Sequence, residues 1–262
     1  MQPSFVSDSA MRPPSFPLLP PLSRIALLLD LDGTLIDLAA RPDAVIVPPS
    51  LPGTLRRLSE RLGGALAVVS GRTVEAVAGL LAGLDIAIAG EHGAALRRAG
   101  EERLERPPLP LLPGGWRVAA ARLAAAHPGV LLEEKPHGFV LHFRGSPEAG
   151  QAIAEALAPM LDGVLDGEAA NFVVFPSAMA WEVRPRGVTK ATAVHALLAA
   201  PPFAGRMPVF VGDDVTDEDG IRAAREAGGF GFRVDETFGD AAGVRAWLDH
   251  LAGELGGGEE RG

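Results

Sequence analysis

Four short apolar runs constrain the fold of this chain more than any other feature. They are IALLLD (residues 25–30), ALAVVS (65–70), IAIAG (86–90) and PVFVGDD (208–214). Continuous apolar runs of this length are typical of parallel strands that are buried on both faces. Helix-compatible segments follow the first two runs, over 50–63 and 73–83. This alternation predicts an α/β fold with a doubly wound parallel sheet and right-handed crossovers.

A different pattern occupies residues 101–183. It predicts two helices and four short antiparallel strands, which lie at 116–127 and 147–161, and at 130–135, 138–144, 172–175 and 180–184. The α/β pattern resumes afterwards. We therefore expect a core formed by 23–100 and 184–254, an inserted α+β cap at 101–183, a disordered leader over 1–22 and a disordered tail over 255–262.

Composition excludes several classes of protein. The 262 residues include 33 acidic and 24 basic side chains, a formal charge of −9, which argues against a nucleic-acid binder. Because the chain has no cysteine, it has no disulfide framework, no cysteine-ligated zinc and no thiol nucleophile. No apolar run approaches the roughly 18 residues of a membrane-spanning helix. We expect a monomeric cytoplasmic protein that binds neither nucleic acid nor membranes.

Polar residues gather where the predicted core strands end, and the ends of parallel strands share one edge of a sheet. Crowded carboxylates repel one another unless a hard divalent cation neutralises them, and Mg²⁺ suits oxygen ligands and phosphate. Each of these short polar segments is by itself equally typical of a solvated turn. Their occurrence together, in this order and at the ends of strands, is not explained by solvated turns. The residues are Asp30 and Asp32, then Ser70, Gly71 and Arg72, then Lys190, and finally Asp213, Asp214 and Asp217.

Such a set favours phosphoryl transfer. A carboxylate held in line with a phosphoryl group attacks phosphorus and forms an aspartyl-phosphate. A second carboxyl protonates the leaving oxygen and later takes a proton from water. Asp30 and Asp32 are two residues apart, so their side chains point the same way if the strand continues through them. Ser70 and Lys190 supply a hydroxyl and an ammonium to hold the phosphoryl group.

The segments DLDGTL, SGR, a single lysine after the insert and GDDVTDED resemble the four motifs of the haloacid dehalogenase phosphatase superfamily. The resemblance implies that Asp30 is the nucleophile and that Asp32 is the general acid and base, with its main-chain carbonyl on Mg²⁺. It implies that Asp213 is the second carboxylate ligand of the metal, supported by Asp214 and Asp217. The phosphate-binding residues that it implies are Ser70, Gly71, Arg72 and Lys190.

The predicted cap strands carry polar residues at a period of two, which places each pair on one strand face. The pairs are Glu133 with Lys135, His142 with Arg144, and Glu182 with Arg184; the alternate residues Leu132, Leu141, Phe143 and Val183 would then face the cap helices. If the polar faces coincide, they suit the hydroxyls and phosphate of a sugar phosphate. The same pattern also fits a solvated sheet face with cross-strand ion pairs.

A second resemblance concerns the substrate. The segments GEHG (90–93), LEEK (132–135), HFR (142–144) and EVRP (182–185) are similar to signature segments of trehalose-6-phosphate phosphatases. The resemblance implies Mg²⁺-dependent hydrolysis of trehalose 6-phosphate. It also implies a set of sugar-binding residues, namely Glu133, Lys135, Glu182, His142, Arg144, Glu91 and His92, of which the last two would lie near the hinge or the sugar.

Three alternatives remain at this point. The same chemistry fits another sugar phosphate, such as sucrose, mannose or mannosylglycerate phosphate. A sugar phosphomutase would use the same motifs but would depend on a bisphosphate activator. A binding module that holds Mg²⁺ without turnover is the non-enzymatic alternative, and Asp32 at the acid/base position argues against it.

Overall fold

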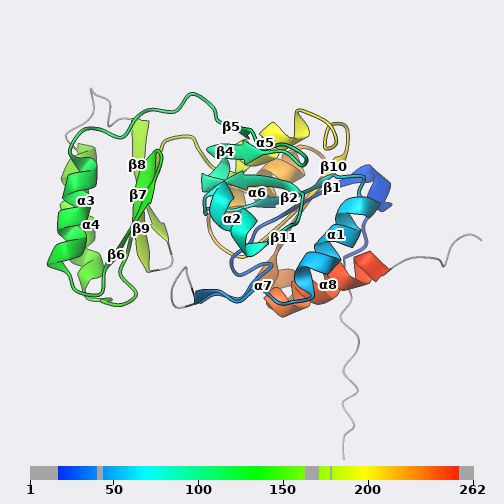
Figure 1. The fold of residues 1–262 in the computed structure, drawn as a ribbon, viewed down its shortest axis with the longest axis horizontal. Helices are drawn as coiled ribbons and strands as arrows, with labels where there is room; N and C mark the ends of the chain where they lie inside the picture. The colour runs from blue at the N-terminus through cyan, green and yellow to red at the C-terminus, as the bar shows by residue number, and fades with distance from the viewer. Residues whose placement is uncertain (1–16, 40–43, 163–170, 178, 254–262) are drawn as a thin grey trace, which may run out of the picture.

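The computed structural model describes residues 17–39, 44–162, 171–177 and 179–253. These residues form two sheets, one in the core and one in the cap (Figure 1). Residues 1–16 and 254–262, which hold most of the expected leader and the whole of the expected tail, lie outside the described residues. Within the described part of the chain, no helix is long and apolar enough to cross a membrane.

The core sheet has seven strands. The five strands from β11 to β3 are parallel, and β4 and β5 extend the edge in antiparallel orientation. The four apolar runs of the sequence correspond to β1, β2, β3 and β10, whereas the short strands β4 and β5 were not predicted. In spatial order the strands are β11 (Phe230–Arg233), β10 (Met207–Gly212), β1 (Ile25–Leu29), β2 (Leu66–Val69), β3 (Ala87–Gly90), β4 (Ala95–Arg97) and β5 (Leu104–Glu105).

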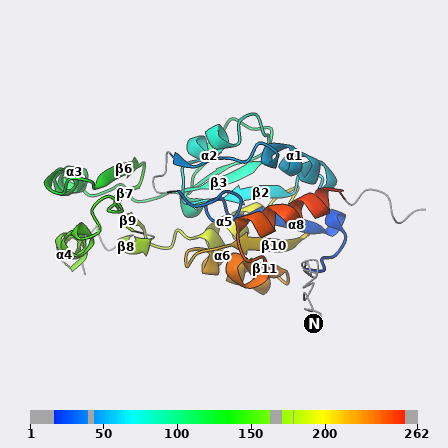
Figure 2. The same ribbon diagram turned by 90° about the horizontal axis from the view of Figure 1, so that it is seen from below.

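Helices cover both faces of this sheet, with α1 and α2 on one side and α5 and α6 on the other (Figure 2). All five residues of β1 are completely buried, as expected for a central strand between helical layers. This confirms the predicted doubly wound α/β core. The core helices are α1 (Leu51–Arg61), α2 (Val74–Leu80), α5 (Lys190–Leu198), α6 (Asp217–Glu226), α7 (Val234–Thr237) and α8 (Ala241–Gly253), with 3₁₀ turns η1 (Leu22–Arg24) and η3 (Glu91–Gly93).

The cap is a four-stranded antiparallel sheet with two helices on its outer face (Figure 1). Its apolar side forms a second hydrophobic cluster with the helices, around Phe139, Leu141 and Val183. The other side of the sheet faces the core. The elements are α3 (Trp116–Ala126), β6 (Leu131–Lys135), β7 (Gly138–His142), α4 (Ala149–Asp162), β8 (Phe172–Ser177) and β9 (Ala180–Pro185), in the sheet order β6-β7-β9-β8.

The boundaries between core and cap differ from the expected ones at both ends. β5 belongs to the core sheet, so the chain leaves the core after Glu105 rather than at residue 101. β9 continues to Pro185 in the cap sheet, so the core resumes after that residue rather than at 184. A strand of two or three residues carries too little hydrophobic pattern for its pairing to be read from sequence, which explains the first difference.

Candidate active site

The carboxyl ends of β1, β2 and β10 meet at one edge of the core sheet. Leu29 pairs with Val211 on one side and Val68 on the other, so the residues after these strands start from neighbouring positions. Asp30 and Asp213 directly follow β1 and β10, and Ser70 follows β2. Lys190 is the first residue of α5, where a capping box between Thr189 and Thr192 begins the helix. The predicted convergence of these groups is therefore present.

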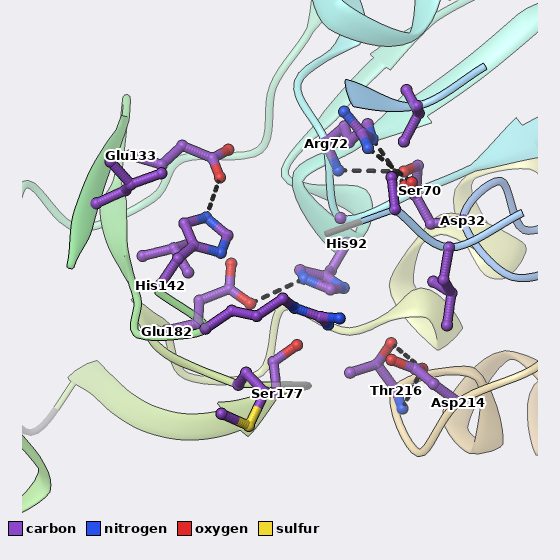
Figure 3. Close-up of a pocket in the computed structure, with 18 of the residues that line it drawn as sticks. Asp32, Ser70, Arg72, His92, Glu133, His142, Ser177, Glu182, Asp214 and Thr216 are labelled. Carbon is purple, nitrogen blue, oxygen red and sulfur yellow. Dashed lines mark hydrogen bonds and ion pairs between the residues drawn. The ribbon is translucent and has the colours of Figure 1, made fainter. Parts of the chain in front are cut away.

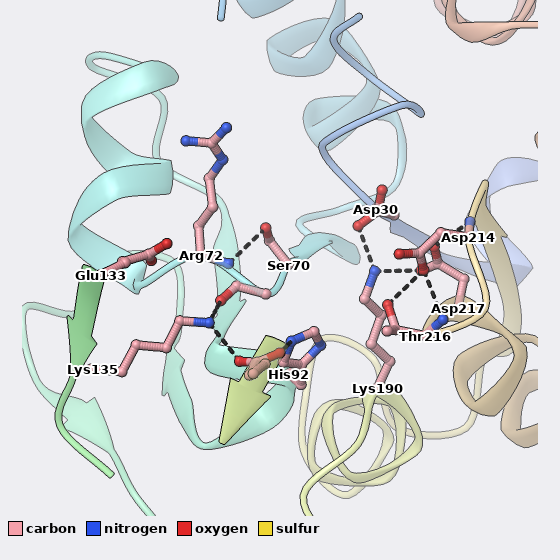
Figure 4. Close-up of polar contacts among 12 residues, drawn as sticks. Asp30, Ser70, Arg72, His92, Glu133, Lys135, Lys190, Asp214, Thr216 and Asp217 are labelled. Carbon is pink, nitrogen blue, oxygen red and sulfur yellow. Dashed lines mark hydrogen bonds and ion pairs between the residues drawn. The ribbon is translucent and has the colours of Figure 1, made fainter. Parts of the chain in front are cut away.

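Asp30 lies at the bottom of the site with only 3% of its surface exposed. Its Oδ1 accepts a hydrogen bond from Lys190 Nζ at 2.6 Å, while its buried Oδ2 has no hydrogen-bond partner among the described residues (Figure 4). Burial, and next the charge of Asp217, raise the pKa of the Asp30 carboxyl well above its ordinary value. An unpartnered buried carboxylate oxygen calls for a cation or an electrophile beside it.

Three carboxylates form an acidic cluster around Lys190. Asp30, Asp213 and Asp217 each place one carboxylate oxygen within 4.8 Å of the others. Lys190 Nζ also donates to Asp217 Oδ1 at 2.5 Å. Burial opposes the charge of Lys190, but the attraction of Asp217 and Asp30 outweighs it and raises the lysine pKa. With all four groups ionised the cluster has a charge of −2, and its all-oxygen donor set fits one hard divalent cation.

The three aspartates after β10 have different roles in the loop. Asp217 Oδ2 accepts the main-chain N–H groups of Asp213 and Asp214, at 3.2 and 3.1 Å. Asp214 Oδ1 accepts the N–H and hydroxyl of Thr216. Asp214 and Asp217 thus fix the conformation of the loop. Burial, then Asp217 and Asp214, raise the pKa of Asp213 from 3.8 to about 7.

Gly33 makes room for Asp213. Its φ of 81° is in the left-handed region, and a Cβ at this position would lie 2.0 Å from Asp213 Oδ2. The glycine of DLDGTL is therefore required both by the turn after β1 and by the carboxylate that packs above it.

Asp32 has a different environment from Asp30. β1 ends at Leu29, so the alternation that would have aligned the two side chains stops before both of them. Each carboxylate oxygen of Asp32 accepts a hydrogen bond from Arg72, at 2.7 Å (Figure 3). Arg72, which we expected on the phosphate, thus has its guanidinium on Asp32. The main-chain N–H of Arg72 donates to Ser70 Oγ at 3.1 Å and orients that hydroxyl.

The cavity between core and cap has a volume of about 440 Å³. It brings together 14 of the 16 residues proposed from the sequence for metal, phosphate or sugar, beginning with Asp30 and Lys190, and in addition Thr216. Glu91 and Asp217 lie outside its lining, Asp217 beneath the loop and Glu91 turned away. The proposed residues in the lining are Asp30, Asp32, Ser70, Gly71, Arg72, His92, Glu133, Lys135, His142, Arg144, Glu182, Lys190, Asp213 and Asp214.

The predicted polar face of the cap points into this cavity. Glu133 pairs with Val140, and Val140 pairs with Glu182, so the three residues share one face of the sheet. Glu133 accepts a hydrogen bond from His142 Nε2 at 2.8 Å. Arg144 lies beyond the end of β7 but also lines the cavity. Glu133, His142 and Glu182 thus lie on one strand face, as their spacing predicted, whereas Arg144 reaches the cavity from outside the strand.

Glu182 connects the cap to the core. Its carboxylate contacts His92 Nε2 at 3.0 Å (Figure 3) and accepts a hydrogen bond from Lys135 Nζ at 2.6 Å. Lys135 Nζ also donates to the main-chain oxygen of Gly71 at 2.9 Å. Burial opposes ionisation of Glu182, but His92 and Lys135 outweigh it and lower the pKa strongly. Glu182 is therefore an anion held between cap and core.

Of the two positions expected for Glu91, near the hinge or near the sugar, the structure shows the first. The buried carboxylate of Glu91 accepts a hydrogen bond from Arg106 Nη1 at 2.9 Å, on the segment that leads into the cap. The side chain therefore contacts the connection between core and cap instead of the cavity.

Several cavity residues were not predicted from the sequence. Leu38, Val45, Leu131, Val140 and Met179 add apolar surface, and Ser177 adds a hydroxyl. Val140 follows from the same alternation as His142, so the pattern contained a signal for it. The others lie in loops or at strand ends, where no periodicity indicates direction.

Comparisons with known proteins identify the family of this chain. The sequence profile of the family described as trehalose-phosphatase matches residues 28–243. A protein of Sinorhizobium fredii named "Probable trehalose-phosphate phosphatase" is 38% identical over 213 residues, which cover 81% of this chain and 78% of that protein. The trehalose-6-phosphate phosphatase of Escherichia coli K12 is 33% identical with the same coverage.

The C-terminal domain of trehalose-6-phosphate phosphatase from C. albicans has the same fold, with a TM-score of 0.72 and 21% identity over 89% of this chain and 94% of that one. The family profile covers most of the chain, including every strand-end motif from Asp30 to Asp217. This chain belongs to the trehalose-phosphatase family, whose members are phosphoric monoester hydrolases with a haloacid dehalogenase-like fold.

Proposed function

We propose that the protein hydrolyses trehalose 6-phosphate to trehalose and phosphate, that it requires Mg²⁺, and that the reaction passes through a phosphorylated Asp30. One observation carries this proposal. The unpartnered, buried Oδ2 of Asp30 lies beside Lys190 on the core side of a cavity whose opposite wall is the polar face of the cap. The cavity thus offers phosphoryl chemistry on one wall and hydroxyl recognition on the other.

In the first half of the reaction, Asp30 Oδ2 attacks phosphorus and the bond from phosphorus to the sugar oxygen breaks. Ser70 and Lys190 hold the phosphoryl oxygens, with a hydroxyl and an ammonium. Asp32 gives its proton to the leaving sugar oxygen, so trehalose departs as a neutral alcohol. In the second half, Asp32 takes a proton from water, the water oxygen attacks phosphorus, and the bond to Asp30 breaks to release phosphate.

The residues present fit a resident Mg²⁺. Asp30 and Asp213 would hold it through their carboxylates and Asp32 through its main-chain carbonyl. The charge of −2 on the cluster and the orphaned Asp30 Oδ2 support this assignment. When bound, the ion neutralises charge on the carboxylates and the phosphoryl group. Lys190 alone leaves two negative charges uncompensated before the phosphate dianion arrives.

The cap would recognise the sugar part of the substrate. Glu133, Lys135 and Glu182 offer acceptors and a donor on one sheet face, and His142 and Arg144 extend this polar surface. Charged groups that hydrogen-bond sugar hydroxyls reject substrates lacking those hydroxyls, because the buried polar groups are then left unpaired. Substrate preference would therefore depend on the cap, and the phosphoryl chemistry on the core.

Phosphate release from a panel of sugar phosphates, with and without Mg²⁺, tests the proposal. We expect trehalose 6-phosphate to be hydrolysed with the highest kcat/KM and EDTA to stop the reaction. Faster release from sucrose, mannose or mannosylglycerate phosphate would assign another substrate. Turnover that depends on an added bisphosphate would indicate a mutase, and the absence of all turnover would indicate a binding module.

The cap assignment has its own test. Glu133→Ala and Glu182→Ala should lower kcat/KM for trehalose 6-phosphate far more than for a small aryl phosphate, which does not reach the cap. Glu134→Ala is the matched control, because this neighbouring glutamate pairs with Arg117 and does not line the cavity. Equal losses on both substrates would mean that the cap face does not read the sugar.

A further inference from the structure

The turn η3, which follows β3 in the core, has an unusual backbone. Glu91 and His92 are consecutive non-glycine residues with φ of 53° and 57°, in the left-handed region of the backbone that non-glycine residues rarely adopt. Such conformations persist only where surrounding contacts hold them, and they cluster at functional sites. The contacts around this turn therefore point to what the turn does.

The main chain of the turn binds the phosphate loop, Ser70–Gly71–Arg72. The N–H of Glu91 donates to the Arg72 carbonyl at 2.8 Å, and the N–H of His92 donates to the Ser70 carbonyl at 3.0 Å. The His92 ring also packs onto Gly71, where a Cβ would lie 2.8 Å from it. The turn and the phosphate loop thus form one packed unit, and a shift of His92 moves both.

The side chains of the same turn bind the cap. His92 contacts Glu182 on β9, and Glu91 contacts Arg106 on the segment entering the cap. Glu182 then bonds Lys135, which returns to the phosphate loop at the Gly71 carbonyl. A closed circuit therefore runs from the phosphate loop through His92, Glu182 and Lys135 back to the loop.

The His92 ring uses one of its nitrogens in this circuit. Because a carboxylate is only an acceptor, Nε2 must carry the proton that is shared with Glu182. The buried Nδ1 has no hydrogen-bond partner within the described part of the chain. Burial lowers the pKa of the His92 ring against the opposing charge of Glu182, and the nearby charges of Arg184 and Lys135 lower it further.

We propose that His92 is a positioning residue that couples sugar recognition to the phosphate loop, and that it is not a sugar ligand. This inference rests on the proposed function for the identity of the sugar. The Nε2–H of His92 orients the Glu182 carboxylate, and the main chain of His92 orients Ser70. Contact of the sugar with Glu182 and Lys135 therefore fixes the loop that holds the phosphoryl group. Binding of the sugar to the cap then raises kcat as well as lowering KM.

A double-mutant cycle between His92 and Glu182 tests the coupling. His92→Ala should lower kcat for trehalose 6-phosphate by about 10²-fold, the size of effect that a misplaced reacting group produces. The same substitution in the Glu182→Ala background should change kcat by less than about threefold, because coupled residues are not additive. His92→Gln, whose amide N–H reaches the Nε2 position, should restore most of the kcat, whereas the shorter His92→Asn should not.

Two controls keep the result interpretable. His137→Ala removes a cap histidine that bonds the Pro110 carbonyl outside the circuit, and it should leave the cycle unchanged. Thermal melting of each variant separates loss of coupling from loss of fold. The inference is overturned if the His92 and Glu182 losses multiply, or if His92→Ala raises KM with kcat intact, as a sugar ligand would.

The proposed function can fail independently of this inference. Absence of trehalose 6-phosphate hydrolysis by the unsubstituted protein refutes the substrate. The cycle is then measured with whichever sugar phosphate the protein hydrolyses fastest, and the same non-additivity is required.

Discussion

Binding of Mg²⁺ to the acidic cluster should depend steeply on pH near neutrality. Burial and the charges of Asp217 and Asp214 raise the pKa of Asp213 from 3.8 to about 7, so the metal-free site holds a proton there at pH 6. A metal ligand must be deprotonated before it binds, so Mg²⁺ and the proton compete for this carboxyl. Affinity therefore falls as the pH falls.

The magnitude follows from the pKa. With a pKa of about 7, the ionised fraction of Asp213 is roughly 0.9 at pH 8 and roughly 0.1 at pH 6, so the Kd for Mg²⁺ should rise about tenfold between them. Asp30 contributes in the same direction, because burial and Asp217 raise its pKa as well. A tenfold rise in the Kd for Mg²⁺ between pH 8 and pH 6 is thus the smallest change that we expect.

Isothermal titration calorimetry with MgCl₂ at pH 6, 7 and 8 measures this effect. Repeating each titration in two buffers of different ionisation enthalpy counts the protons released, which should approach one at pH 6 and zero at pH 8 if Asp213 alone titrates. Asp213→Asn should weaken binding and flatten its pH dependence, whereas the surface variant Glu155→Gln should change neither. A Kd that stays constant from pH 6 to pH 8, without proton release, would refute the reasoning.

Three further predictions follow from the same site. Asp30→Asn should abolish phosphate release while the far-ultraviolet circular dichroism stays unchanged; substantial turnover would exclude Asp30 as the nucleophile. Gly33→Ala should reduce both Mg²⁺ affinity and activity, because its Cβ would lie 2.0 Å from Asp213 Oδ2. The control is Gly100→Ala, which has a φ of 74° and open space around it. This control should lower the free energy of unfolding, measured by chemical denaturation, only by the backbone strain of about 1 kcal/mol. The free energy of unfolding in EDTA should fall as the pH rises from about 4 to 7, because the folded state binds the Asp213 proton more tightly than the unfolded chain does. Mg²⁺ should reverse this trend. A free energy of unfolding that rises over that range in EDTA would contradict the raised pKa of Asp213.

The sequence by itself determined the core of the site. Asp30, Ser70 and Asp213 each follow a buried apolar run, and parallel strands leave such residues at a common edge whatever the details of packing. The same holds for the cap, where the period of two placed Glu133, His142 and Glu182 on one face. Both predictions rest on repeating geometry, which short stretches of sequence encode locally.

The tertiary structure alone decided where side chains outside that repeating geometry point. β1 ends before Asp32, so nothing in the spacing indicated that its carboxylate would pair with Arg72, 40 residues further along the chain. Likewise, the sequence left open whether Glu91 lies near the hinge or the sugar, and the left-handed backbone of η3 turns its carboxylate toward Arg106. Beyond the end of a strand, a side chain takes its direction from individual dihedral angles and from partners distant in sequence, and those are known only when the chain is folded.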